Sequence, residues 1–229
     1  MYPGMSASYP IDGSTALIEK FEDGPIWTIG YLVYDPVSLE AVVVDVPIGS
    51  ADEIYKRVRE TKLRLKFISA THGHWDHIGE MRKLKALTRA MVCAHPSDEW
   101  MMRDPNGLLV PPPLHIEPVS IDIPLEGGME LTLGNYALKV LHTPGHSQGS
   151  ICLVDEAARV MFTGDTLFAG SIGRTDLPSG SYGEITKSIS TKIFAYPEES
   201  RIFPGHGPDS TLKRERSENQ FVQMIFAEK

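Results

Sequence analysis

Residues 71–77, Thr-His-Gly-His-Trp-Asp-His, constrain the fold of this chain more than any other stretch. Residues 65–70 have the pattern of a short strand and residues 78–89 that of a helix, so the motif is expected in the turn between them, a usual place for a site in a layered α/β protein. Side chains two apart on an extended chain share one side, which pairs His72 with His74. The turn that follows brings Asp76 and His77 to face a second point nearby. One short peptide is therefore predicted to offer two ligands to each of two metal ions.

Strand and helix patterns alternate through both halves of the chain. Strands are predicted at residues 26–34, 41–46, 65–70, 91–94, 129–133, 136–141, 150–154, 159–162 and 201–203. Helices are predicted at residues 51–61, 78–89 and 181–194, with a helical tail from residue 210. Two such halves, stacked sheet on sheet with helices outside, predict an α/β fold in the form of a four-layer α/β/β/α sandwich. No linker or repeat divides residues 1–229, so we expect one domain.

The composition of the chain argues against nucleic acid and membrane as partners. The formal net charge of −8 argues against a general nucleic-acid binder, which needs a basic face. No run of eighteen apolar residues is present, so no membrane span is expected, and residues 1–9 have no signal-peptide pattern. Cys93 and Cys152 lie in separate apolar runs, which is typical of buried free thiols in a reducing cytoplasm. The net charge says little about a small-molecule substrate.

Three later strand ends carry metal-capable residues beside Gly or Pro, which lets the backbone approach a ligand closely. These residues are His146, Asp165 and His206. Asp45 interrupts an apolar strand and is expected either to support the metal loop or to bond local backbone, and the sequence leaves both open. His95 and His115 lie in the proline-rich residues 95–118, outside any cluster, and are expected not to be ligands. That segment is long enough to be a lid or a substrate wall.

These motifs together resemble the metallo-β-lactamase superfamily, and within it the glyoxalase II-like hydroxyacylglutathione hydrolases. The resemblance runs from Asp45 to the segment after His206 and includes Gly164–Phe168. It implies two metal sites that share one bridging carboxylate: His72, His74 and His146 at the first, Asp76, His77 and His206 at the second, and Asp165 between them. An imidazole and carboxylate donor set suits two Zn²⁺ ions, with iron or manganese also compatible.

The resemblance implies hydrolysis of a thioester, such as an acyl-glutathione, by attack of a metal-bridging hydroxide whose proton Asp76 steers. Arg174 is then expected to bind a substrate carboxylate, the alternative being a structural ion pair with Asp176. Glyoxalase II itself has an additional C-terminal helical domain that grips glutathione. This chain ends 23 residues after His206, so no separate C-terminal glutathione-binding domain is expected and glutathione recognition stays open.

Other activities remain in competition. Residues 173–176 also resemble the persulfide dioxygenase branch, which would place one iron on His72, His146 and Asp165. The Pro-Gly-His-Gly-Pro context of His206 favours the dinuclear hydrolases instead. Lactone or phosphodiester hydrolysis on the same metal core and a non-enzymatic metal-binding scaffold are further alternatives. Antibiotic hydrolysis is disfavoured, because the β-lactamases of the superfamily are expected to place cysteine where this chain has Asp165.

Overall fold

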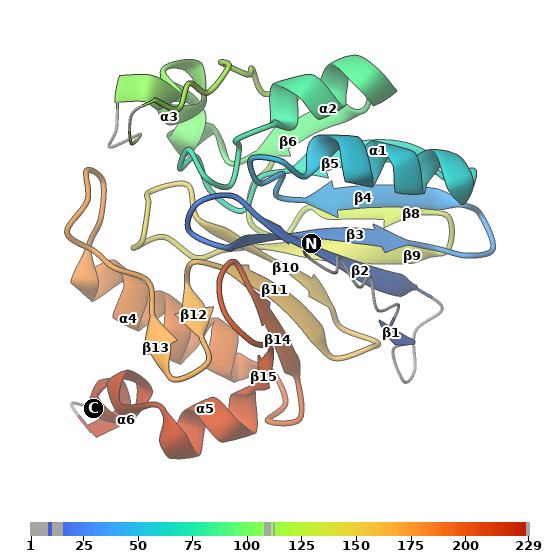
Figure 1. Ribbon diagram of the computed structural model, residues 1–229. Coiled ribbons are helices and arrows are strands. Elements are labelled where there is room, and N and C mark those ends of the chain that lie inside the picture. The colour runs from blue at the N-terminus through green and yellow to red at the C-terminus, as the bar shows by residue number, and fades with distance from the viewer. Residues whose placement is uncertain (1–8, 11–15, 108–110, 112, 228–229) are drawn as a thin grey trace.

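Two β-sheets pack face to face, and helices cover the outer face of each (Figure 1). The computed structural model describes residues 9–10, 16–107, 111 and 113–227. Among these residues no helix is both long and apolar enough to cross a membrane. The predicted four-layer α/β/β/α sandwich is confirmed.

The first sheet has seven strands in chain order: β1 (Tyr9–Pro10), β2 (Leu17–Asp23), β3 (Thr28–Tyr34), β4 (Glu40–Val44), β5 (Arg64–Ser69), β6 (Met91–Ala94) and β7 (Ile123–Pro124). Strands β4 to β7 run parallel, which requires crossover connections. Helices α1 (Ala51–Glu60) and α2 (Met81–Thr88) provide the first two. Ile54 and Val58 of α1 are four residues apart and buried, so one stripe of the helix packs on the sheet.

The second sheet has six strands in the order β15 (Ser210–Thr211), β14 (Arg201–Pro204), β11 (Val160–Gly164), β10 (Ile151–Asp155), β9 (Tyr136–His142) and β8 (Glu130–Leu133). Its outer face is covered by α4 (Tyr182–Thr191), α5 (Leu212–Glu218) and α6 (Gln220–Ala227). Ile185 and Ile189 of α4, and Ile193 just after it, lie four residues apart and are fully buried. A two-stranded sheet, β12 (Leu167–Phe168) and β13 (Ser171–Ile172), follows β11.

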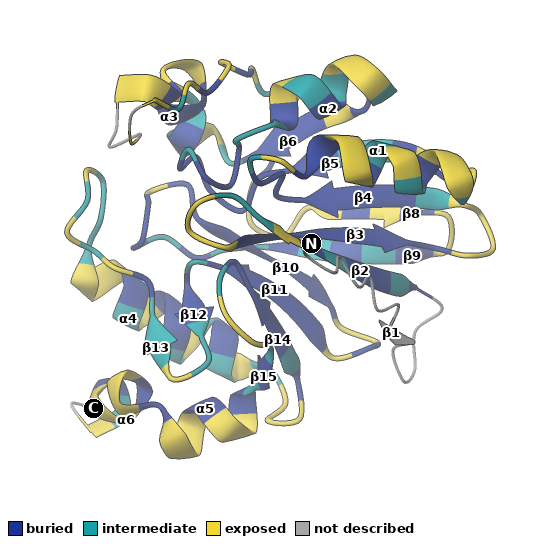
Figure 2. Ribbon diagram, viewed as in Figure 1, coloured by how far each residue is buried: buried dark blue, intermediate teal, exposed yellow. Residues whose placement is uncertain are grey.

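Successive residues of a strand point to opposite faces of the sheet and therefore pack in different apolar layers. Val42 and Val44 face the layer between the sheets, whereas Ala41 and Val43 face the layer under α1 and α2. The central strands β3, β4, β10 and β11 are therefore buried on both faces, as their dark blue colour in Figure 2 shows.

The proline-rich segment forms only short helices: the 3-10 turns η1 (Pro96–Asp98) and η2 (Pro105–Gly107), and α3 (Glu99–Arg103) between them. The predicted C-terminal helix begins two residues late, after β15, and is divided at Asn219. The side-chain oxygen of Asn219 accepts hydrogen bonds from the backbone N–H groups of Phe221 and Val222, so this residue caps α6. A third 3-10 turn, η3 (Ile193–Ala195), extends α4.

The strand directions bring the site segments to one end of the sandwich. Strands β9, β11 and β14 run the same way, so His146, Asp165 and His206 follow strand ends at one edge of the second sheet. The backbone N–H of Ile151 donates to the carbonyl of Thr71 at 2.8 Å, which joins that edge to the loop after β5. The loop after β5 of the first sheet and the loops after β9, β11 and β14 of the second therefore lie at the same end of the sandwich.

Candidate metal centre

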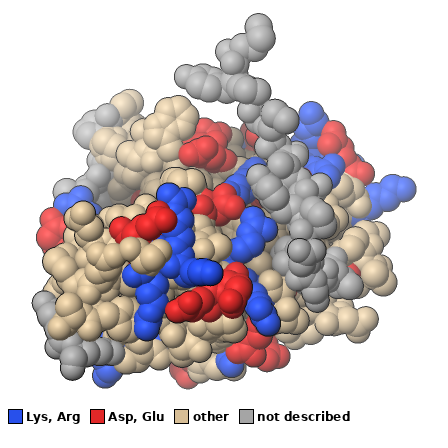
Figure 3. Space-filling model, turned by 90° about the horizontal axis from the view of Figure 1, so that it is seen from below, with Lys and Arg blue, Asp and Glu red and all other residues tan. Residues whose placement is uncertain are grey.

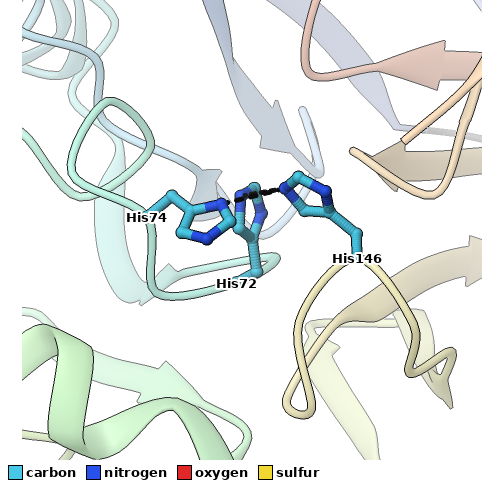
Figure 4. A group of neighbouring side chains, drawn as sticks. All are labelled: His72, His74 and His146. Atoms are coloured by element: carbon cyan, nitrogen blue, oxygen red, sulfur yellow. Dashed lines mark hydrogen bonds between the residues drawn. The ribbon is translucent and has the colours of Figure 1, made fainter. Parts of the chain in front are cut away.

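All seven side chains predicted as metal ligands come together between these loops. They form three overlapping groups, and within each group the ligand atoms lie within 4.8 Å of one another. The groups are His72, His74 and His146; His72, His77 and Asp165; and Asp76, His77 and His206. Figure 4 shows the first group, with His72 and His74 on one loop and His146 pointing to them from another.

Three imidazole nitrogens converge in that first group. His74 Nδ1 lies 2.9 Å from His146 Nε2, which lies 3.2 Å from His72 Nε2. Burial and the neighbouring imidazoles lower the pKa of His72 well below its usual value and that of His74 to about 3. Both rings are therefore neutral, and their lone pairs are available to a cation. Zinc bonds of about 2.0–2.1 Å to tetrahedral ligands separate two nitrogens by roughly 3.3 Å, close to the spacing observed.

The group formed by Asp76, His77 and His206, called the second group below, contains a carboxylate. Asp76 Oδ2 lies 3.2 Å from His77 Nε2 and 3.2 Å from His206 Nε2. Burial opposes the charge on His77, but Asp76, Asp165 and Asp45 together raise its pKa well above the usual value. Burial likewise opposes the charge on Asp76, but His77 and His206 lower its pKa overall. The Asp76 carboxylate is therefore ionised, and a metal bound beside it would take the place of the proton that the carboxylates hold on His77.

Asp165 faces both groups. Its Oδ1 lies 3.2 Å from His77 Nε2, and its Oδ2 lies 3.6 Å from both His146 Nε2 and His206 Nε2. The nearby histidines lower the pKa of this carboxyl despite its burial. A single ionised carboxylate therefore lies between the two groups of side chains.

Unpartnered polar atoms test whether a metal fits here. Within the described part of the chain, His74 Nε2, His77 Nε2 and Asp165 Oδ1 are buried and have no hydrogen-bond partner. A buried polar atom without a partner costs about 1–3 kcal/mol, and coordination to a metal would remove that cost for the atoms that face the site. The residues thus form a metal-binding cluster of histidine and aspartate side chains.

Asp45 supports this cluster from behind. Its Oδ2 lies 2.8 Å from His77 Nδ1 and accepts a 2.8 Å hydrogen bond from the Thr71 hydroxyl. Its Oδ1 accepts from the Thr71 backbone N–H at 2.7 Å. Of the two roles left open by the sequence, the structure shows support of the metal loop: the backbone that Asp45 bonds is 26 positions away, and Asp45 fixes the ring of His77 and the start of the motif.

A cavity of about 320 Å³ opens onto the cluster. Five of the seven clustered side chains line it, and its remaining wall is formed by Ile26, Trp75, Arg174, Leu177 and Pro178. The Arg174 guanidinium makes two 2.7 Å hydrogen bonds to the Asp176 carboxylate, and both side chains are largely exposed, at 60 % and 68 %. Arg174 therefore lines the cavity and also makes the ion pair with Asp176, which was the alternative to substrate binding.

The two histidines expected not to be ligands lie elsewhere. The His95 ring stacks on His142 with ring centroids 3.9 Å apart, and His115 lines a separate cavity of about 150 Å³. Neither belongs to the three ligand groups found among the described residues. The proline-rich segment contributes a different residue, Asp98, whose carboxylate contacts two ligand loops. No motif in the sequence pointed to Asp98, or to Thr28, whose hydroxyl donates to Asp76 Oδ2 at 2.8 Å.

Residues 30–206 match the family described as the Metallo-beta-lactamase superfamily, and the chain belongs to it. The probable metallo-hydrolase YqgX of Bacillus subtilis is 31 % identical over 205 residues, covering 89 % of this chain and 97 % of that protein. The hydroxyacylglutathione hydrolase GloC of Haemophilus influenzae is 33 % identical over 189 residues, covering 80 % and 87 %. The chain is accordingly a metal-dependent hydrolase, as the resemblance predicted.

Solved structures share the whole fold. BLEG-1, described as a B3 metallo-beta-lactamase, superposes with a TM-score of 0.82 at 33 % identity and covers 90 % of this chain and 99 % of its own. TTHA1623, solved in a di-iron-bound form, gives a TM-score of 0.76 at 31 % identity and covers 88 % and 98 %. The iron in this second structure leaves the identity of the metal in the present chain open.

Proposed function

We propose that this chain is a dinuclear-metal hydrolase of a thioester, such as an acyl-glutathione. The observation that carries the proposal is the position of Asp165, whose two oxygens face both ligand groups at the floor of one cavity. His72, His74 and His146 would hold one metal, Asp76, His77 and His206 the other, and Asp165 would be shared. Bound there, such a pair supplies a Lewis acid and a water of lowered pKa. The donor set favours zinc, with iron or manganese as alternatives.

The cavity wall supports a substrate with an apolar part. The apolar side chains of Ile26, Trp75, Leu177 and Pro178 line the cavity together with Asp76. An apolar acyl or thiol group packed on that wall would exclude water from the site. The Asp76 carboxylate, held by the Thr28 hydroxyl, is placed to orient or accept the proton of the attacking water. A thiolate leaves without a strong acid, which matches a cavity lining whose described residues include no lysine or tyrosine.

GloC, named as a hydroxyacylglutathione hydrolase, supports the thioester class over other substrates. BLEG-1 is 33 % identical and is named as a β-lactamase, so the prediction that this chain does not hydrolyse antibiotics is tested directly. The experiment is a substrate panel on zinc-reconstituted protein, comprising acyl-glutathiones, acyl thioesters of simple thiols, a lactone, a phosphodiester and a β-lactam. We expect the thioesters to give the highest kcat/KM. A higher value for any other class would replace the thioester assignment.

One observation keeps a second function in competition. The three residues that would hold a single iron in a persulfide dioxygenase are also close together, with His72 Nε2 and Asp165 Oδ2 at 3.2 and 3.6 Å from His146 Nε2. His74 Nδ1, however, lies 2.9 Å from the same His146 nitrogen, which fits a third histidine on that metal. Oxygen uptake with a persulfide, measured on iron-loaded protein, separates the two functions.

Arg174 is proposed to bind a substrate carboxylate distant from the reacting carbonyl. Its pair with Asp176 is exposed and therefore worth little, so a substrate carboxylate can replace Asp176 in the same two-point geometry. Arg174→Ala is expected to raise KM for carboxylate-bearing thioesters about ten- to a hundredfold, the effect of losing a charged hydrogen bond of about 1.5–3 kcal/mol. Neutral thioesters serve as the matched substrates and should change little. Equal effects on both, or lower thermal stability with unchanged kinetics, would assign Arg174 to the ion pair alone.

A further inference from the structure

The carboxylate of Asp98 lies buried between the two loops that carry the three-histidine group. Its Oδ2 accepts a 2.9 Å hydrogen bond from the backbone N–H of Gly73, the residue between His72 and His74. The same oxygen lies 2.6 Å from the hydroxyl of Ser147, the residue after His146. Its Oδ1 accepts from the backbone N–H of Gly149 at 2.7 Å. Asp98 is fully buried, so these contacts replace the water it has lost.

Two glycines make room for this carboxylate. A Cβ at Gly149 would lie 2.5 Å from Asp98 Cγ, and a Cβ at Gly73 would lie 3.0 Å from the Asp98 backbone oxygen. Gly149 lets its loop approach the carboxylate of Asp98 this closely, and Gly73 lets the other loop approach the Asp98 backbone. The backbone on either side is therefore shaped around Asp98, although Asp98 is in none of the three ligand groups.

The other ligand group has its own supports. The Thr28 hydroxyl donates to Asp76 Oδ2 at 2.8 Å, and Asp45 Oδ2 lies 2.8 Å from His77 Nδ1. Thr28 also pairs with His206 in an isolated β-bridge. Thr28 and Asp45 are both buried, but Asp45 also binds Thr71, whose hydroxyl lies 3.2 Å from His72 Nδ1, so Asp45 contacts the second group directly and the first through Thr71. The contacts described here place Thr28 against the second group and Asp98 against the first.

We propose that Asp98 is a positioning residue for the His72, His74 and His146 site, and that Asp98 and Thr28 support the two metal sites independently of each other. Asp98 sets the separation of the two loops and thereby the convergence of the three nitrogens, while Thr28 holds the Asp76, His77 and His206 site. This inference rests on the proposed dinuclear centre. Its consequence is that either metal can be weakened without the other.

The test is a metal titration of matched variants. Asp98→Asn keeps the shape but turns an N–H toward a backbone N–H donor, and Thr28→Val removes the hydroxyl on the other side. Each should weaken one of two metal-binding steps roughly ten- to a hundredfold, as loss of a residue that orients ligands does, and leave the other step unchanged. Binding is followed by competition with a chromophoric chelator and by the visible spectrum of the Co²⁺-loaded protein, with no use of activity.

His146→Ala and His206→Ala identify the two steps, because each removes a side chain from one group only. The Co²⁺ spectrum of Asp98→Asn at limiting metal should match that of His146→Ala, and Thr28→Val should match His206→Ala. Ser147→Ala, which removes one contact of Asp98, repeats the test if Asp98→Asn does not fold, and it should weaken the same step. Equal weakening of both steps, or wild-type binding in both variants, overturns the inference. A wild-type chain that binds one metal overturns the proposed function as well.

Discussion

Replacing Asp165 with alanine is expected to remove both metals from the protein and to lower thioester hydrolysis more than any single His→Ala substitution. The substitution takes a ligand from two sites at once, since Asp165 faces His146 on one side and His77 and His206 on the other. It also removes one of only two carboxylates in the seven-residue cluster, so two dications lose much of their charge compensation. The loss of metal affinity should exceed the roughly 10- to 100-fold cost of losing a supporting residue. Elemental analysis after dialysis measures it directly.

Asp176→Ala is the matched control for Asp165→Ala. Asp176 is a carboxylate of the neighbouring segment, largely exposed and paired with Arg174, and it belongs to none of the ligand groups found among the described residues. It should keep both metals. If Asp165→Ala also kept both metals and most of its activity, Asp165 would be a turn residue in a Gly-Asp-Thr sequence.

Gly205→Ala is expected to disrupt the centre by sterics alone. A Cβ at this position would lie 2.4 Å from Asp165 Oδ1 and 2.4 Å from His77 Cε1. The backbone has little freedom to retreat, because its N–H donates to Gly164 at 2.9 Å and its carbonyl accepts from Ile29 at 2.8 Å. The ligands must therefore move by an amount on the order of 1 Å, which can cost about 10²-fold in rate. We expect kcat/KM for a thioester to fall by that factor, with the Asp76, His77 and His206 site weakened most.

Gly183→Ala separates this steric effect from a general effect of replacing glycine. Gly183 lies exposed in α4 with no atom within 4 Å of an added Cβ. Alanine is the better helix former by up to about 1 kcal/mol, so this variant should keep its activity with an equal or higher Tm. Wild-type kcat/KM and metal content in Gly205→Ala would show that the loop after β14 is not packed against the ligands as described.

Periodicity predicted most of the sandwich but missed β2. Four of the seven residues of β2 are charged, and the charge hides the alternation that identifies a strand. Glu19 is nevertheless fully buried, because Arg57 of α1 donates two hydrogen bonds to it at 2.6 and 2.8 Å and the Tyr34 hydroxyl donates a third at 2.9 Å. Arg57 is 38 positions away. A local sequence pattern cannot reveal a partner that only the fold supplies.

The residues of the site likewise divide into those that the sequence predicted and those that it did not. Ligands carried by a motif, such as His72 and His74, were predicted by position, and all seven lie together in the structure. Asp98 was missed because its partners are 25 to 51 positions away, and Thr28 because its partner is 48 positions away. Chemistry that needs several unusual residues in one peptide is visible in a sequence. A single residue that holds a ligand loop in place, such as Asp98 or Thr28, belongs to no sequence motif and is recognised only in the folded chain.

The proposed function requires two metals that act together on a thioester. The most direct measurement is the metal content of zinc-reconstituted protein, determined on the same preparation that is assayed for thioester hydrolysis and oxygen uptake. The proposed dinuclear centre predicts about two metals per chain, with hydrolysis and no oxygen consumption. A ceiling near one metal per chain, with iron preferred over zinc and oxygen consumed in the presence of a persulfide, would contradict it.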